Sequence, residues 1–291
     1  MKRERFVLIF VLFLLTNSQV SNTWGQHAAP APLTASDYRN EGLRFYELRL
    51  FDKAVEAFNQ ALKLRPDYAE VFNDLGVTFA ALGKHREAIA SLKQAIRYKP
   101  EFAQAYCSLG SEFYQLGELK IAIEFLRKAI RLKPDYALAF NNLGAAFSEA
   151  GAYSEALAAY DQAVRLRPLW AEAHRNLALA SWPAGDYDRV FAHLRTAIAL
   201  KPDYFEAYNN LGVAQYKKRQ YKEAVASLNE AIKINPGYDD AIYNLGVLKL
   251  ALKQREDAVV QYHRLKSLNP VLASALYRGL YQGMVLDLRN K

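Results

Sequence analysis

The sequence predicts an all-α solenoid of seven tandem helix–turn–helix repeats, followed by one more helix near the C-terminal end. The first observation behind this prediction is a proline that recurs every 34 residues, at Pro66, Pro100, Pro134, Pro168, Pro202, Pro236 and Pro270. The second is that small residues recur at fixed distances before these prolines. A fixed period of this length is the signature of repeat architectures, in which each unit packs mainly on its neighbours.

Small and large residues alternate within each repeat as two packed helices require. When each proline is counted as position 32, positions 8, 20 and 27 are Gly or Ala in nearly every copy, and positions 4, 7, 11 and 24 are mostly large. The small side chains allow two antiparallel helices to approach closely, and the large ones fill the layer between them. Position 8, for example, is Gly42, Gly76, Gly110, Gly144, Ala178, Gly212 and Gly246.

Residues at the repeat boundaries predict where the helices begin and end. Glycine at position 15 is expected to form the turn between the two helices, and proline at position 32 to end the second helix. Thr34 and Asp37 have the spacing of a capping box before the first helix. Acidic residues at position 33 are expected to be the N-cap or the dipole partner of the next helix; they are Asp67, Glu101, Asp135 and Asp203.

This density of in-register positions resembles the tetratricopeptide-repeat (TPR) family over residues 35–270. The resemblance implies a right-handed superhelical solenoid in which the first helix of each repeat lines a concave groove. The expected repeats are 35–68, 69–102, 103–136, 137–170, 171–204, 205–238 and 239–270. After them, apolar residues recur every four positions, at Leu272, Leu276, Leu280, Met284 and Leu288. This spacing predicts a capping helix over 271–291 that covers the open end of the last repeat.

The first 25 residues have the layout of a signal peptide. Basic residues precede ten apolar residues, 6–15, which as a helix reach only roughly 15 Å, about half of a bilayer core. Cleavage near Ser18 or near Gly25 both fit, and an uncleaved anchor is the alternative. Residues 26–34 are expected to form a linker because of Pro30 and Pro32. The predicted location is therefore secreted, or the periplasm or cell envelope.

The net charge of +8 raises the question of an anionic partner such as nucleic acid. Ten cations lie at positions 29 and 31, where the last turn of the second helix favours positive charge: Lys63, Arg65, Arg97, Lys99, Arg131, Lys133, Arg165, Arg167, Lys201 and Lys233. A structural role for these cations is favoured over a phosphate-binding stripe. We therefore predict no nucleic-acid partner.

The resemblance implies that positions 2, 5, 6, 9, 12 and 13 of the first helix point into the groove. These positions hold three cations and seven carboxylates, so the groove is expected to be acidic although the chain is basic. Amides at positions 5 and 6 can donate to and accept from the main chain of an extended peptide. A similar asparagine ladder occurs in the repeats of O-linked N-acetylglucosamine transferase. The candidate peptide-binding residues are Asn40, Asn73, Asn141, Asn142, Asn176, Asn209, Asn210 and Asn244, with Tyr114, Trp182 and Tyr216 as apolar anchors.

Two alternatives bear on this groove. Asparagine at position 6 is common in the family, so these residues are equally compatible with family background. The family's carboxylate clamp for C-terminal tails requires Asn where this chain has Asp74, and cations where it has Gln104 and Ser108, so that mode is excluded.

The fifth repeat departs from the pattern. His174, Ala178, Ser181 and Val190 replace the usual residues at positions 4, 8, 11 and 20, and Pro183 follows Trp182. Proline removes a helical hydrogen bond, so the first helix of this repeat is expected to end early. Tolerated drift is the favoured explanation, and a bend that presents Trp182 to a partner is the alternative.

No catalytic pattern is recognised. The five histidines lack metal-binding spacing, Cys107 is the single cysteine, and 21 residues after Pro270 are too few for a catalytic domain. We predict a non-enzymatic scaffold, without cofactor or metal, that binds a protein or peptide partner, with membrane contact only if the signal segment remains. The alternatives are an envelope assembly subunit that interacts through its ends and C-terminal helix, and a basic surface that binds an anionic polymer or lipid.

Overall fold

The computed structural model describes residues 32–282 and 286–289, and its regular secondary structure there is entirely α-helical. The chain divides into two units, Met1–Leu33 and Thr34–Lys291, and all the described helices belong to the second unit. The predicted signal peptide and nearly all of the predicted linker lie outside the described residues.

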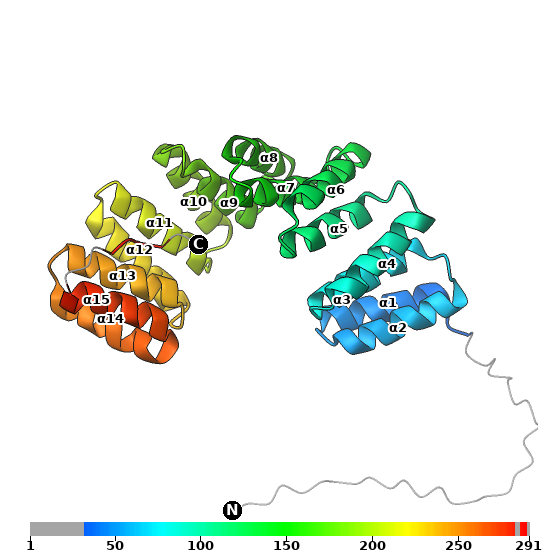
Figure 1. Ribbon diagram of the computed structural model, residues 1–291, viewed down its shortest axis with the longest axis horizontal. Coiled ribbons are helices and arrows are strands. Elements are labelled where there is room, and N and C mark those ends of the chain that lie inside the picture. Colours follow the sequence, from blue (N-terminus) through cyan, green and yellow to red (C-terminus); the bar gives the residue numbers. More distant parts are fainter. Residues whose placement is uncertain (1–31, 283–285, 290–291) are drawn as a thin grey trace, which may run out of the picture. The chain divides into compact units, whose positions relative to one another are not determined.

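The helices follow one another as pairs, each made of a first helix A and a second helix B (Figure 1). The A helices are α1 Ala35–Glu47, α3 Ala69–Ala81, α5 Ala103–Gln115, α7 Ala137–Glu149, α9 Ala171–Ser181, α11 Phe205–Lys217 and α13 Asp239–Ala251. The B helices are α2 Phe51–Leu64, α4 His85–Tyr98, α6 Leu119–Leu132, α8 Tyr153–Leu166, α10 Tyr187–Leu200, α12 Tyr221–Ile234 and α14 Arg255–Leu268. Each A helix packs on its own B helix, and each B helix packs on the next A helix. The predicted all-α solenoid is confirmed.

Close contact between helices A and B depends on the glycine at position 8. A Cβ atom added to Gly76 would lie 2.6 Å from Cγ of Leu92, and one added to Gly110 would lie 2.7 Å from Cγ of Leu126. Leu92 and Leu126 are fully buried. The large residue at position 24 therefore occupies the space that the missing side chain leaves, as the alternation of residue sizes predicted.

The turn between helices A and B uses the left-handed backbone region in every repeat. Gly83, Gly117, Gly151 and Gly185 have φ angles of 69–76°. The three repeats that lack this glycine hold Arg49, Arg219 and Lys253 in the same conformation, with φ of 59–60°. A residue with a Cβ is disfavoured there, so these three turns are strained relative to the four glycine turns.

The helix starts are only partly as predicted. Thr34 and Asp37 form the predicted capping box, with Asp37 accepting from the N–H of Thr34 at 2.8 Å. The acidic residues at position 33 are not N-caps, because the N-cap is the aromatic residue that follows each of them. Those four N-cap residues make no side-chain cap bond, so only the N-cap alternative for the acidic residues is wrong.

The aromatic residue at position 34 is the contact partner of half of the ten cations that the sequence analysis assigned to the ends of B helices. In five repeats the cation at position 31 lies over the ring at position 34. The distance from Cζ of the arginine to the ring centroid is 4.3 Å for Arg65 and Tyr68, and 4.8 Å for Arg167 and Trp170. The other three pairs are Lys99–Phe102, Lys133–Tyr136 and Lys201–Tyr204. These cations directly follow the last residue of helix B and therefore stabilise the join to the next repeat.

In the fifth repeat, α9 is two residues shorter than the other A helices, as Pro183 predicted. His174 is 7% exposed, and its Nδ1 lies 3.0 Å from Nδ1 of His193 on α10. Its Nε2 lies 2.9 Å from the carbonyl oxygen of Pro168, which only accepts hydrogen bonds, so Nε2 carries a proton. In the neutral pair Nδ1 of His174 therefore accepts and Nδ1 of His193 donates.

The predicted C-terminal helix is shorter than expected. Helix α15 comprises Pro270–Gln282, and residues 286–289 have no helical structure, so a helix over 271–291 is wrong in its extent. The capping part is correct: Leu276 and Leu280 are buried, and a Cβ on Gly246 would lie 2.6 Å from Cδ2 of Leu276. In the last repeat, Leu276 of α15 thus fills the space beside the position-8 glycine. In other repeats the large residue at position 24 fills this space. Met284 lies outside the described residues.

Candidate functional site: the A-helix face

The A helices α1, α3, α5, α7 and α9 contact one another in turn, as do α11 and α13, and we call the surface that the A helices present the A-helix face. Residues 35 apart meet across this face, because position 5 of one repeat lies next to position 6 of the following repeat. Asn176 donates to Asn141 at 3.0 Å, and Asn244 donates to Asn209 at 2.8 Å. Ser108 donates to Asn73 at 3.2 Å, Arg39 donates to Asp74 at 2.7 Å, and Asn142 approaches Sγ of Cys107 at 3.8 Å. We call this series the amide ladder.

The candidate asparagines differ in exposure along the chain. Asn40 is exposed, and Asn73, Asn141, Asn142 and Asn176 are half-buried. Asn209, Asn210 and Asn244 are fully buried. The last repeats therefore have their amides covered, whereas those of the first five repeats are still accessible.

Asn210 is the unsatisfied member of the set. Neither its Oδ1 nor its Nδ2 has a hydrogen-bond partner within the described parts of the chain, and Nδ2 of Asn209 also has none. A buried amide without a partner costs about 1–3 kcal/mol. The sixth repeat thus carries amide groups with unused hydrogen-bonding capacity on the candidate face.

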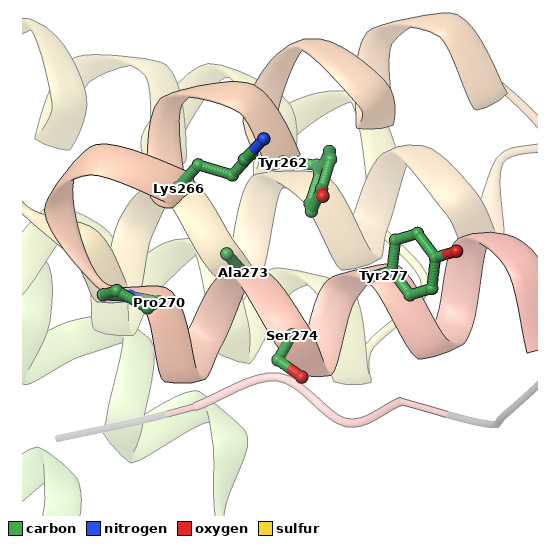
Figure 2. A pocket seen from close by; sticks show the side chains of 6 residues that line it. All are labelled: Tyr262, Lys266, Pro270, Ala273, Ser274 and Tyr277. Carbon is green, nitrogen blue, oxygen red and sulfur yellow. The ribbon is translucent and has the colours of Figure 1, made fainter.

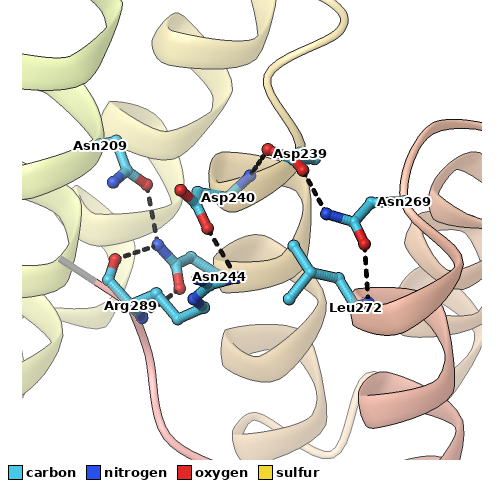
Figure 3. A network of polar contacts seen from close by, with 7 residues as sticks. All are labelled: Asn209, Asp239, Asp240, Asn244, Asn269, Leu272 and Arg289. Atoms are coloured by element: carbon cyan, nitrogen blue, oxygen red, sulfur yellow. Dashed lines mark hydrogen bonds and ion pairs between the residues drawn. The ribbon is translucent and has the colours of Figure 1, made fainter. Parts of the chain in front are cut away.

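Residues 286–289, here called the C-terminal segment, lie on this face over α11 and α13 (Figure 3). The N–H of Arg289 donates to Oδ1 of Asn244 at 2.6 Å, and Nδ2 of Asn244 donates to the carbonyl oxygen of Arg289 at 2.7 Å. One side-chain amide therefore holds both main-chain groups of one residue. This is the hydrogen-bonding mode that the sequence predicted for a peptide ligand.

Side chains of the C-terminal segment are held as well. Leu288 is 6% exposed and belongs to the apolar cluster formed by α11 to α15. The guanidinium of Arg289 pairs with Asp240 at 3.0 Å, and Asp287 pairs with Lys217 at 2.9 Å. The Lys217 ammonium holds the pKa of the Asp287 carboxyl below its usual value. The segment is thus bound by main-chain, apolar and ionic contacts together.

The acidic character of the face is weaker than its sequence indicates. Four of its seven carboxylates lie in ion pairs: Glu70 with Lys99, Asp74 with Arg39, Glu172 with Lys201 and Asp240 with Arg289. Burial raises the pKa of Asp74, and the bond from Arg39 only partly offsets this effect. The cations that pair with Glu70 and Glu172 come from the ends of B helices, which counting on the A helices alone did not include.

The three candidate aromatic anchors are all half-buried. Burial raises the pKa of Tyr114, and Glu149 adds to the shift. Trp182 packs edge-on against Tyr187 at 5.7 Å, and Tyr216 lies 5.8 Å from Tyr221. Trp182 and Tyr216 therefore pack partly on the first residue of their own helix B.

Four family models for this kind of repeat match the chain. The model described as TPR repeat matches residues 42–83, 78–111, 110–151 and 184–219. Models described as tetratricopeptide repeat match residues 141–189, 205–238 and 240–270. The chain belongs to the tetratricopeptide-repeat family.

Solved structures of other TPR proteins have the same fold. The Cut9–Hcn1 hetero-tetramer of the APC/C superposes with a TM-score of 0.70 at 20% identity, over 85% of this chain and 48% of that one. The Pseudomonas aeruginosa pilF protein gives a TM-score of 0.65 at 23% identity, over 74% of this chain and 97% of the pilF chain. YrrB, described as a TPR protein with an unusual peptide-binding site, gives a TM-score of 0.52 at 23% identity. The match covers 66% of this chain and 100% of the YrrB chain. A search of curated proteins gave no match.

A second feature of this TPR protein lies at its C-terminal end, between α14 and α15. A cavity of about 360 Å³ is lined by Tyr262, Lys266, Pro270, Ala273, Ser274 and Tyr277 (Figure 2). Tyr277 and Tyr281 are 42% and 50% exposed, and their rings lie 4.7 Å apart. Leu276 and Leu280 of the same helix are buried inside the chain's own core and are therefore not exposed to a partner.

Other chemistry on the TPR domain is limited. Cys107 is buried, and burial raises the pKa of its thiol to about 11, in keeping with a small structural side chain. Within the described residues, no three His, Cys, Asp or Glu side chains are grouped as metal ligands would be. None of the helices that the structure describes is long and apolar enough to cross a bilayer.

The residues of the C-terminal segment are the part of the site that the sequence analysis missed. Leu288 was assigned to a helical series because of its four-residue spacing from Leu280. In the sequence Gly283 follows Gln282, and glycine is a frequent signal for the end of a helix. That signal predicts the end of the helix, but it carries no information on where the following residues bind.

Proposed function

We propose that this TPR protein is a scaffold that binds an extended peptide segment of a partner protein along its A-helix face. TPR proteins are in general interaction scaffolds. What we propose beyond this is the mode of binding, in which side-chain amides hold the main chain of the peptide. The observation that carries it is the two-bond contact between Asn244 and the main chain of Arg289. A peptide bound by repetition of this contact is recognised through its main chain at the amide positions, and through pockets or charges between them.

The accessible part of the face is the place for such a partner. Asn142 and Asn176 belong to consecutive repeats and are half-buried, so their side chains are reachable from solvent. Asn142 donates to Oγ of Ser111 and to Sγ of Cys107 in the preceding repeat, and Asn176 donates to Oδ1 of Asn141, so the orientation of each amide is fixed. A fixed amide loses little conformational freedom when it binds a main chain, and this supports its role as a preformed contact.

The test uses peptides selected from a phage-displayed library of unstructured sequences against the full chain. Replacing Asn142 and Asn176 together by Ala is expected to weaken binding of the selected peptides about tenfold to a hundredfold, because each substitution removes main-chain hydrogen bonds worth about 1 kcal/mol. The matched control replaces Asn59 and Asn229, which are exposed on B helices, and leaves binding unchanged. Unchanged affinity of the Asn142/Asn176 variant, with an unaltered melting temperature, contradicts the proposal.

A second candidate function is assembly through the C-terminal end of the solenoid. The exposed pair Tyr277 and Tyr281, with the guanidinium of Arg255 4.9 Å from the ring of Tyr281, favours it. Tyrosine and arginine are enriched at the centre of protein interfaces. Replacing both tyrosines by Ser is expected to change the oligomeric state or the partner set, and an unchanged light-scattering mass and partner set rejects this candidate.

We further propose that residues 1–25 direct the chain out of the cytoplasm, to the periplasm, cell envelope or medium. The basic start and ten apolar residues support this proposal. Cell fractionation and N-terminal sequencing of the mature chain test it. Recovery of the chain in the cytoplasm with its first residues intact rejects it.

A further inference from the structure

The C-terminal segment binds the A-helix face as a ligand would, although it belongs to the same chain. It runs in an extended form from Asp287, beside Lys217 in the last turn of α11, to Arg289, beside Asp240 in the first turn of α13. Three kinds of contact are made within these residues: a main-chain pair, a buried leucine and two ion pairs. The described repeats therefore contain one peptide site that is already occupied.

We infer that this occupied surface, formed by α11 and α13, is a recognition site for an extended segment in which an apolar residue precedes an arginine. The chain's own Leu288 and Arg289 fill it, and a partner with the same pattern binds there by displacing them. The inference deepens the proposed function and rests on it, because it names the chemistry that one part of the A-helix face selects.

The apolar requirement follows from the surroundings of Leu288. Its side chain joins the cluster that includes Val213 of α11 and Tyr243 of α13, and it is 6% exposed there. Burial of a leucine side chain is worth about 1.5–3 kcal/mol. A polar residue at this place in a partner forfeits that gain, so the surface discriminates in favour of an apolar residue.

The requirement for arginine follows from Asp240. Its carboxylate is 8% exposed and forms an ion pair with Arg289, with Oδ1 3.0 Å from Nη1. A buried carboxylate needs a cation beside it, and a carboxylate so placed disfavours an acidic partner residue. Lys217 selects less strongly for an acidic residue in the partner, because its own partner Asp287 is 75% exposed. Ion pairs at the surface contribute little to the free energy of binding.

Competition by the chain's own segment follows from its tether. Only residues 283–285 separate α15 from the segment, so its effective concentration at the site is of the order of millimolar. A partner with weak affinity is therefore excluded. A partner with more contacts, extending along the amide ladder towards Asn176, outcompetes the segment.

The test compares the full chain with a tail-released variant that carries Leu288→Asp and Arg289→Glu. The probe is a fluorescein-labelled synthetic peptide with the sequence of residues 286–291, LDLRNK. We expect at least about tenfold tighter binding of the probe to the tail-released variant than to the wild type. Adding Asn244→Ala to the released variant is expected to remove that binding. The control Asn229→Ala, at an exposed residue of α12 away from the A-helix face, is expected to leave the wild-type affinity unchanged.

Equal affinity of the wild type and the tail-released variant overturns the inference, and so does a lack of probe binding to both. A second measurement does not depend on folding of the released variant. Hydrogen exchange of the amides of 286–289 in the wild type is expected to be slower than in the free peptide, and faster in Asn244→Ala; free-peptide rates in the wild type overturn the inference.

Failure of this inference is distinguishable from failure of the proposed function. If selected peptides lose affinity on replacement of Asn142 and Asn176 while tail release has no effect, only the competing tail is rejected. If tail release strengthens probe binding while Asn142 and Asn176 have no effect, the extended mode along the earlier repeats is rejected and the local site remains.

Discussion

Asn244 binds both main-chain groups of Arg289, with Oδ1 accepting the N–H at 2.6 Å and Nδ2 donating to the carbonyl oxygen at 2.7 Å. The same Nδ2 also donates to Oδ1 of Asn209, so the amide ladder and the C-terminal segment meet at this side chain. The two functions considered for the asparagines, inter-repeat contact and main-chain recognition, are therefore compatible in one residue.

The non-glycine turns are expected to be points of strain. Arg219 has φ of 60°, and a left-handed conformation costs a residue with a Cβ about 1–2 kcal/mol relative to its preferred regions. Arg219→Gly is expected to raise the free energy of unfolding by about 0.5–1 kcal/mol in urea titrations. The adjacent control Lys218→Gly, at φ −86°, is expected to lower it. An Arg219→Gly chain that is less stable than the wild type contradicts the turn assignment.

Helix α15 is expected to be part of the core. Leu276 is fully buried against Gly246, so Leu276→Ala is expected to destabilise the last repeat by about 2–4 kcal/mol through lost burial and a cavity. Tyr277→Ala is the matched control, because Tyr277 is the next residue in the chain and is 42% exposed. We expect it to lower the free energy of unfolding much less than Leu276→Ala does. Circular dichroism during urea unfolding measures both, and equal effects of the two substitutions indicate that α15 does not cap the solenoid.

The His174–His193 pair is expected to make stability depend on pH. Burial lowers the pKa of His193 below 6.5; the charges of His174 and Arg189 add to this effect, and Asp161 opposes it. Since the folded chain binds this proton less readily than the unfolded chain, the stabilisation is complete above about pH 6.5 and is lost as the pH falls through the lowered pKa.

Unfolding free energies at pH 7.5 and pH 5.5 test this expectation. The wild type is expected to lose more stability on acidification than His193→Asn, in which the titrating group is absent. His263→Asn, at an exposed histidine, serves as the control and is expected to behave like the wild type. An identical pH dependence of the wild type and His193→Asn shows that the pair has no linkage to folding.

Cys107 is expected to be unreactive in the folded chain. With a pKa of about 11 and a buried side chain, roughly one thiol in a thousand is ionised at pH 8, and the thiolate is the reactive form. Iodoacetamide at pH 8 is expected to label the native chain slowly and the urea-unfolded chain rapidly. Fast labelling of the native chain contradicts the burial of the third repeat's position 5.

The helical part of the fold was predictable because its determinants are local and repeated. The glycines at position 8, the turn at position 15 and the capping box at Thr34 each act within a few residues or within one hairpin. The 34-residue period repeats the glycine in six of the seven repeats and the turn in all seven. The early end of α9 at Pro183 is of the same kind. The N-cap alternative for the acids at position 33 was wrong by one residue, because their neighbours Tyr68 and Phe102 are the N-caps.

The candidate site was predictable only as a set of residue types. Amides at positions 5 and 6 identified a face capable of main-chain recognition, but their exposure does not follow from their positions: Asn40 is exposed and Asn210 is fully buried. The carboxylates of the face were counted correctly, yet Glu70 and Glu172 are paired with cations from other helices.

By itself the sequence determined the repeat, the helix pairs and the small-to-large packing between them, because these depend on neighbours close in the chain. The tertiary structure decided which amides pair across repeats, how His174 meets His193, and where the C-terminal segment binds. Those contacts join residues 19 to 70 positions apart. Their formation depends on how the repeats stack in space, which no local pattern of residues specifies.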